Sequence, residues 1–267
     1  MGARIAAGLV GLALVLPVLI YGGPLGVWWL MLPFLVIALD EYVRMALPHL
    51  TLPGRALYHL GGLGLVAVAV FAPRQLLLAL PALVMLCLSL PMFARAQVEQ
   101  GARDAVHLGF GYAYVPMMMA PLALLRQEPD GLGLIFFLLA STWLGDTGAY
   151  FAGRAFGKTP LFPRVSPKKT VEGVVGGLLL AVAGAGGFKW LLGVQLSWPV
   201  ALGAAAVLDV AGVVGDLSES MLKRAFGVKD SGTIMPGHGG ILDRIDSLLF
   251  TAPLLWVIVE GRAAFLP

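Results

Sequence analysis

The residue types best suited to chemistry gather between residues 215 and 246. If residues 216–224 are helical, Asp216, Glu219 and Lys223 share one face, because residues three, four and seven positions apart lie on the same side of a helix. Asp243 and Asp246 repeat the three-residue spacing further along the chain. Carboxylates from two helix ends suit a magnesium ion that also carries substrate phosphates. The spacing predicts a metal site with four candidate ligands: Asp216, Glu219, Asp243 and Asp246.

Basic residues form a second pattern. All six lysines lie at or after Lys158, and residues 146–246 hold 18 of the 33 charged residues. A lysine ammonium is a compact point charge that suits phosphate groups; the alternative explanation is chance together with the general excess of positive charge in cytoplasmic loops. We interpret Asp216, Asp243, Lys223 and Arg244 as candidate catalytic residues. The candidate substrate-binding residues are Asp146, Lys168, Lys169, Thr170, Arg224, Lys229, Asp230 and His238.

The glycines on either side of His238 also favour a ligand-binding role for this segment. They let backbone amides approach a ligand closely, while a flexible turn with an incidental histidine is the alternative. Residues 152–159 also fit a relaxed phosphate-loop pattern. That pattern follows an apolar helix and runs into Pro160, so it lacks the strand-to-helix context that a true phosphate loop needs.

Composition indicates which elements must position these residues. Of the 267 residues, 59% are hydrophobic and only 12% are charged, against roughly 25% in soluble domains. The single cysteine and the net charge of +3 exclude a disulfide scaffold and a nucleic-acid-binding domain. We predict an all-α, polytopic integral membrane protein with about nine transmembrane helices. Their approximate positions are 4–21, 25–47, 57–72, 75–93, 105–125, 131–152, 171–192, 198–214 and 247–259.

The distribution of positive charge predicts the orientation. With nine spans, 14 of the 18 lysines and arginines fall on the side of the N-terminus and of the two polar loops, and four fall on the other side. Positive charge near span ends favours the cytoplasmic face. We therefore expect a protein of the cytoplasmic membrane whose N-terminus and loops 153–170 and 215–246 face the cytoplasm.

The chain divides by its polarity. We interpret residues 1–104 as N-terminal transmembrane helices, and residues 105–267 as a C-terminal transmembrane catalytic region that carries both loops. Asp40, Glu41, Asp146 and Asp209 fall within or beside spans, where a carboxylate facing lipid is costly, so we expect them to face the bundle interior. Runs of small residues such as 184–187 allow close helix packing and hence a homodimer.

The C-terminal motif resembles that of a known family. Ser220-x-x-Lys223-Arg224, then Lys229-Asp230-x-Gly232, then Pro236-x-His238-Gly239-Gly240-x-x-Asp243-Arg244-x-Asp246 is similar to the signature of phosphatidate cytidylyltransferases, also called CDP-diacylglycerol synthases. Ser166-Pro167-Lys168-Lys169-Thr170-x-Glu172-Gly173 resembles a second stretch of that family, as does Asp146-x-x-Ala149-Tyr150. The N-terminal half agrees only as a set of hydrophobic spans.

This resemblance implies that CTP and phosphatidic acid react to give CDP-diacylglycerol and pyrophosphate. It implies Mg²⁺ as the cofactor, bound by Asp216 and Asp243 with Glu219 and Asp246 as further ligands or as residues that orient them; a second cation is left open. Lys223, Arg224, Lys229 and Arg244 would bind phosphates, while Lys168, Lys169 and Thr170 would hold the CTP tail or the lipid phosphate. Two alternatives remain: a related enzyme acting on another lipid phosphate, and a secondary transporter, which intramembrane acids also suit.

Overall fold

The structure is a computed structural model that describes residues 2–94, 97–234 and 239–264. Most of this chain is helical. The N-terminal part comprises α1 (Gly2–Tyr21), α2 (Gly23–Ala46), α3 (Leu52–Phe71) and, after the 3₁₀ turn η1 (Pro73–Gln75), α4 (Leu76–Ala94). The last helices are α9 (Val171–Leu192), α10 (Trp198–Ala225) and α11 (Leu242–Glu260), which ends in the 3₁₀ turn η4 (Gly261–Ala264).

Two long rods in the middle of the chain each contain a π-helical turn. The helix α5 (Val98–Tyr112) continues through η2 (Ala113–Met117) into α6 (Met118–Gln127). The helix α7 (Gly131–Leu139) continues through η3 (Ala140–Leu144) into α8 (Gly145–Phe156). A π turn widens the helix locally and is common at functional sites.

Seven helical segments within the described residues are long and apolar enough to cross a membrane. They comprise α2, α3, η1 with α4, α5 to α6, α7 to α8, α9 and α10. The predicted all-α, polytopic membrane architecture is confirmed at this level.

The two polar loops are shorter than the sequence predicted. In the segment 153–170, α8 runs to Phe156, and β1 (Pro160–Phe162) pairs antiparallel with β2 (Ser166–Thr170) as a small hairpin. In the segment 215–246, α10 continues to Ala225 and α11 already begins at Leu242. The helices extend this far because their polar ends bind one another, as described below.

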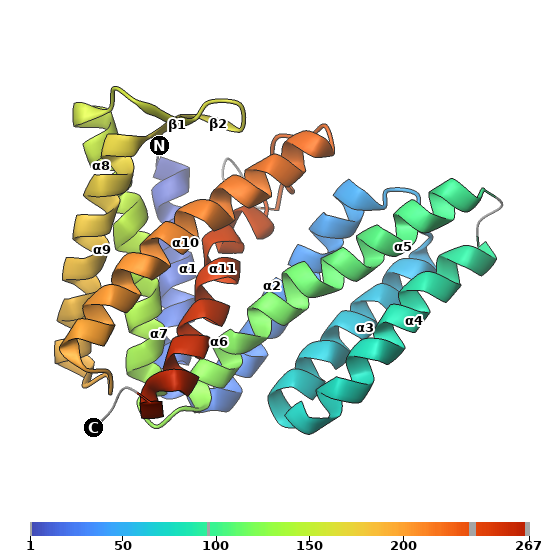
Figure 1. Ribbon diagram of the computed structural model, residues 1–267, viewed down its shortest axis with the longest axis horizontal. Helices are drawn as coiled ribbons and strands as arrows, with labels where there is room; N and C mark the ends of the chain where they lie inside the picture. The colour runs from blue at the N-terminus through green and yellow to red at the C-terminus, as the bar shows by residue number, and fades with distance from the viewer. Residues whose placement is uncertain (1, 95–96, 235–238, 265–267) are drawn as a thin grey trace.

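The described segments that carry the candidate residues lie at one end of the helix assembly. Figure 1 shows the start of α1, the β1–β2 hairpin, the end of α10 and the start of α11 near the same end. The end of α11 and the α6–α7 connection lie at the opposite end (Figure 1). Residues 153–170 and the described residues of 215–246, although far apart in sequence, therefore lie towards the same end of the assembly.

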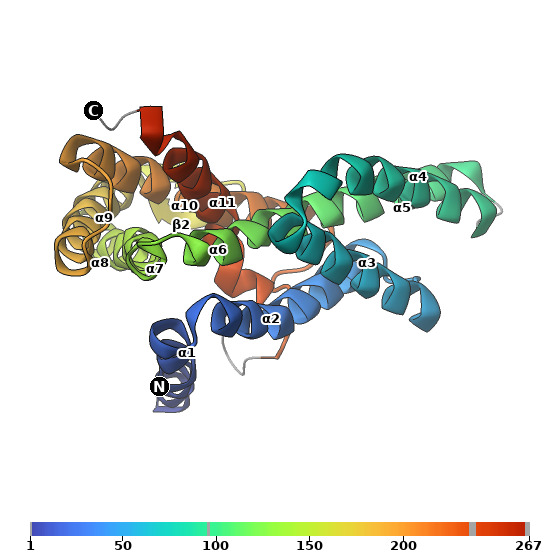
Figure 2. The same ribbon diagram turned by 90° about the horizontal axis from the view of Figure 1, so that it is seen from below.

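Two apolar cores hold the helices. One gathers α2 to α6 and the first half of α11, around Leu35, Tyr42 and Leu249. The other gathers α1, α7, α9, α10 and the second half of α11, around Phe137, Leu208 and Leu255. Figure 2 shows α3 to α5 on one side and α7 to α10 on the other. The predicted division near residue 104 stays a prediction; this position lies within α5.

Candidate active site

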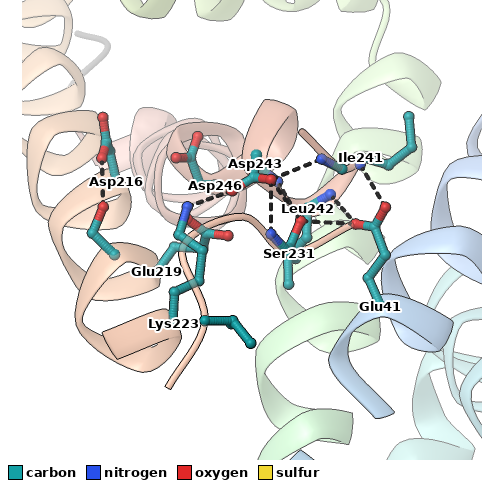
Figure 3. A network of polar contacts seen from close by, with 12 residues as sticks. Glu41, Asp216, Glu219, Lys223, Ser231, Ile241, Leu242, Asp243 and Asp246 are labelled. Atoms are coloured by element: carbon teal, nitrogen blue, oxygen red, sulfur yellow. Dashed lines mark hydrogen bonds and ion pairs between the residues drawn. The ribbon is translucent and has the colours of Figure 1, made fainter. Parts of the chain in front are cut away.

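A buried lysine joins the ends of α10 and α11. The Lys223 ammonium forms ion pairs with Glu219, one turn earlier on α10, and with Asp243 in the first turn of α11. The side chains are only 10%, 1% and 9% exposed, respectively. Buried charges persist only when they are paired, so this triad fixes the two helix ends against each other (Figure 3).

The second oxygen of Asp243 organises the segment before α11. Asp243 Oδ2 accepts hydrogen bonds from the backbone amide of Gly240 at 2.7 Å, and from the amide and the hydroxyl of Ser231, both at 2.9 Å. These hydrogen bonds and the ion pair with Lys223 favour the charged form of this carboxyl. Asp243 is therefore ionised and fully engaged with the protein.

Glu41 reaches the same segment from α2. Its carboxylate accepts hydrogen bonds from the backbone amides of Ile241 at 2.9 Å and Leu242 at 2.8 Å, and it shares the single proton of the Ser231 hydroxyl, 3.0 Å away, with Asp243 (Figure 3). A carboxylate at the start of α11 satisfies amides that lack partners within the helix and suits the positive end of the helix dipole. Glu41 thus connects the N-terminal helices directly to the candidate site.

The surroundings of Glu41 explain two glycines of the motif. A Cβ atom at Gly232 or Gly240 would collide with the Glu41 carboxylate. Glu41 is only 5% exposed, which confirms that it faces the interior. Its position inside the bundle was predicted from the sequence, but its role in the site was not; the available signal was an acid within an apolar span.

Asp216 lies one and two turns before Glu219 and Lys223 on α10 and contacts the hairpin. Asp216 Oδ2 is 2.7 Å from Lys169 Nζ of β2, and Asp216 Oδ1 accepts a hydrogen bond from Ser220 Oγ at 3.3 Å. The two predicted polar segments, 153–170 and 215–246, are therefore joined through an ion pair. This confirms their proximity, whereas the substrate roles of Lys169 and Asp216 stay predictions.

Two further acids lie near Asp216. Asp246 interacts electrostatically with Asp216 and Asp146, and its Oδ1 accepts a hydrogen bond from the Ser247 amide at 2.7 Å. Asp146, in the first turn of α8, interacts electrostatically with Lys169, Asp216 and Arg244. Unlike buried Glu41 and Asp209, Asp146 is exposed, so the expectation that it faces the interior is not confirmed.

The hairpin is anchored by residues around Thr170. The Thr170 hydroxyl accepts a hydrogen bond from the Gly173 amide at 3.1 Å and caps α9. Glu172 accepts hydrogen bonds from the Thr159 hydroxyl at 2.9 Å and from the Lys158 amide at 3.1 Å. Thr170 therefore has a structural role whether or not it also binds substrate, and Glu172 fixes the path of the chain into β1.

The remaining predicted residues are more peripheral. Lys168, Lys229, Asp230 and Arg244 are exposed. The Arg224 guanidinium is also exposed and donates a hydrogen bond to the Val228 carbonyl at 3.1 Å, so it secures the turn after α10. His238 lies outside the described residues. The structure thus brings the acids, Lys169 and Lys223 together and leaves these other cations around them.

Comparison with known proteins identifies the family. A model described as the cytidylyltransferase family matches residues 2–261. The chain belongs to this family. It is 41% identical over 155 residues to the phosphatidate cytidylyltransferase of Bacillus subtilis (strain 168), covering 58% of this chain and 55% of that protein.

Two other relatives carry the same name. The Staphylococcus aureus (strain COL) protein is 43% identical over 134 residues, covering 50% of this chain and 52% of its own length. The Brucella suis biovar 1 (strain 1330) protein is 45% identical over 148 residues, covering 55% and 54%. The chain spans about half the length of the curated relatives it matches.

The carboxylates of this family member suit a metal that is also held by substrate. Among residues 2–94, 97–234 and 239–264, no three or more His, Cys, Asp or Glu side chains form a ready metal cage. Magnesium needs only one or two carboxylates when phosphates supply further oxygens. Asp243 is occupied by Lys223 and three other donors, and buried Glu219 by Lys223. Asp216 and Asp246 bind fewer protein donors than Asp243 and are less buried than Glu219, so this pair of carboxylates fits a magnesium ion.

The Lys223 triad predicts a stability defect. Lys223→Met leaves two buried carboxylates without their cation, which costs about 3–5 kcal/mol of unfolding free energy when one partner of a buried pair is removed. We expect a lower melting temperature in detergent, measured by tryptophan fluorescence. Exposed Lys158→Met is the matched control and should change little. The combined variant Lys223→Met, Glu219→Gln, Asp243→Asn should recover stability; a triple variant no more stable than the single one would contradict the ion-pair account.

Proposed function

We propose that this protein is a phosphatidate cytidylyltransferase, which transfers the cytidylyl group of CTP to phosphatidic acid and releases pyrophosphate. The observation that carries the proposal is the joined site of α10, α11 and the hairpin, in which Asp216, Asp246 and Lys169 lie together in a chain of the cytidylyltransferase family. The relatives that bear this enzyme name support the choice of lipid substrate.

The chemistry requires charge control more than a nucleophilic side chain. A phosphate monoester is already ionised near neutral pH, so the lipid phosphate oxygen can attack the α-phosphorus of CTP directly. The new bond joins this oxygen to the α-phosphorus, and the bond to the β-phosphate oxygen breaks to release pyrophosphate. The main barriers are repulsion between anions and alignment, which positioned cations lower.

Mg²⁺, when bound, would neutralise phosphate charge and align the triphosphate. Asp216 and Asp246 would hold it, whereas Asp243 and Glu219 keep Lys223 and the start of α11 in place. Lys169 would exchange Asp216 for a phosphate oxygen when nucleotide binds. The cations Lys168, Arg224, Lys229 and Arg244 are exposed, and they would suit the triphosphate and the leaving pyrophosphate.

A substrate panel tests this proposal. Purified protein in lipid nanodiscs is incubated with α-labelled CTP, Mg²⁺ and phosphatidic acid, a polyprenyl phosphate or an ether-linked phosphatidate analogue, and chloroform-soluble label is counted. We expect labelling with phosphatidic acid that requires Mg²⁺. Labelling of polyprenyl phosphate alone would replace the lipid assignment, and ion-coupled flux in vesicles without labelling would favour a transporter.

The membrane topology is part of the proposal. We propose that α1 and α11 cross the membrane in addition to the seven apolar segments, and that the hairpin end of the assembly faces the cytoplasm. In a Cys87→Ala background, Arg164→Cys in the hairpin should react with a membrane-impermeant maleimide only from the cytoplasmic side. Gln195→Cys, between α9 and α10, should react only from outside. The reverse pattern would overturn the orientation.

A further inference from the structure

A small groove lies next to the carboxylate site, between the α5–α6 rod and the ends of α10 and α11. Its volume is about 260 Å³, and it is lined by Phe110, Tyr114, Met118, Ser218, Met221 and Phe250, among others. Figure 1 shows α5 and α10 as separate inclined helices. The α5–α6 rod and the helix α10 are both long and apolar enough to span the membrane, so a groove between them can receive lipid.

The groove and the site share one stretch of α10. Ser218, Met221 and Leu222 line the groove, while Asp216, Glu219 and Lys223 on the same turns carry the charges. This part of α10 therefore presents Met221, Leu222 and the Ser218 hydroxyl to the groove, and charged side chains to the site. A molecule with an apolar tail and a phosphate head would match the two surfaces at once.

Tyr114 supplies a second hydroxyl at the groove, beside that of Ser218. It lies in the π turn η2, is only 3% exposed, and its ring stacks on Phe110 with ring centroids 5.6 Å apart. Its hydroxyl has no hydrogen-bond partner among the described residues, although a buried hydroxyl without a partner is costly. The hydroxyl also interacts electrostatically with Glu219 and Asp246. Tyr114 thus lines the groove with an unused donor close to the carboxylates.

A second apolar groove, between α8 and α9, lacks such a group. It is larger, about 530 Å³, but its lining consists of glycine, alanine, leucine and phenylalanine, including Phe151, Gly176 and Leu179. It offers a lipid chain no hydrogen-bonding side chain. The comparison favours the groove beside Tyr114 for a lipid that must place its head in the site.

We propose that the groove between α5–α6 and α10–α11 binds an acyl chain of the phosphatidate substrate, with the Tyr114 hydroxyl donating a hydrogen bond to an oxygen of its headgroup. This inference rests on the proposed function and names the route by which the lipid enters. The groove holds the chain at the membrane side of α10, and the phosphate lies towards Asp216 and Lys169 on the other.

Kinetics with both substrates test the headgroup contact. Tyr114→Phe removes only the hydroxyl, so we expect the KM for phosphatidate to rise about two- to tenfold, the range for one lost hydrogen bond, with the KM for CTP unchanged. A merely structural role for the hydroxyl would alter both constants or the melting temperature. An unchanged KM for phosphatidate, or an equal rise in both KM values, would overturn the contact.

Filling the groove tests the chain. Met221→Trp should raise the KM for a long-chain phosphatidate several-fold and affect a short-chain one much less. Leu179→Trp, at another exposed apolar position, on the other groove, is the matched control and should leave both unchanged. The reverse result would assign the chain to the α8–α9 groove and overturn the proposal.

Photolabelling separates this inference from the proposed function, because it needs no turnover. Wild-type protein in nanodiscs is irradiated with a phosphatidate that carries a diazirine in one acyl chain, and labelled peptides are mapped. We expect label on 110–118 and 218–222, reduced by Met221→Trp. Label spread evenly over lipid-facing helices would overturn the groove even if the enzyme is active, whereas groove labelling in an inactive protein would overturn only the reaction.

Discussion

Asp246→Asn should lower turnover about a thousandfold, because loss of one metal-binding carboxylate removes about 4 kcal/mol of transition-state stabilisation. Asparagine keeps the shape of the side chain and its place near Asp216, so the protein should still fold. The measurement is the initial rate of lipid labelling from α-labelled CTP at saturating substrates. Asp216→Asn should behave alike, since both carboxylates are less committed to protein donors than Asp243.

Metal dependence provides a second readout for the same prediction. The Mg²⁺ concentration that gives a half-maximal rate should be higher for Asp246→Asn and for Asp216→Asn than for the wild type. Glu260→Gln, an exposed substitution at the far end of α11, is the control and should match the wild type. Turnover within tenfold of the wild type in folded Asp246→Asn protein would contradict the metal assignment.

Glu41→Gln should reduce turnover about a hundredfold, although residue 41 lies about 200 positions before the α11 amides that it binds. The Glu41 carboxylate accepts hydrogen bonds from Ser231, Ile241 and Leu242. The amide group of a glutamine would face at least one of these donors with a donor of its own. Loss of a buried hydrogen bond to a charged group costs about 1.5–3 kcal/mol. The start of α11 would shift, and with it Asp243 and Asp246. The measurement is kcat beside KM for CTP.

A graded set of variants separates positioning from folding. Ser231→Ala removes the hydroxyl that contacts both Glu41 and Asp243 but leaves the two α11 amides bound to Glu41, so it should cost about tenfold in kcat. Neighbouring Asp40→Asn, which loses only a partly exposed ion pair with Arg44, should have little effect. Equal losses in Asp40→Asn and Glu41→Gln would show that α2, and not this contact, is responsible.

Much of the site could be predicted because its residues recur at helical spacing. Asp216, Glu219 and Lys223 do lie on one face of α10, and Lys169 does contact Asp216 from the other polar segment. The bounds of the polar segments were less predictable. Local polarity suggested loops, whereas buried ion pairs between Lys223 and Asp243 allow α10 and α11 to continue as helices.

The spacing of residues along the sequence could not predict contacts between distant parts of the chain. Nothing in the sequence near Glu41 indicates that it binds Ile241 and Leu242, because that contact depends on how α2 packs beside α11. The same holds for Tyr114, whose exposure and missing partner are properties of the packed helices. From the sequence, Asp243 was expected to bind the metal directly and Asp246 to be a further ligand or an orienting residue. The hydrogen bonds that Asp243 accepts from the protein are the reason to propose Asp246 in its place.

The central claim is that the α-phosphate of CTP moves to a lipid phosphate. The most direct measurement incubates the protein in nanodiscs with phosphatidic acid, Mg²⁺ and CTP labelled either at the α- or at the γ-phosphate, and then separates lipid from water-soluble products. The account predicts α-label in CDP-diacylglycerol and γ-label in pyrophosphate, both lost in Asp246→Asn. Transfer of the γ-label to lipid, or no label in lipid from folded protein, would contradict it.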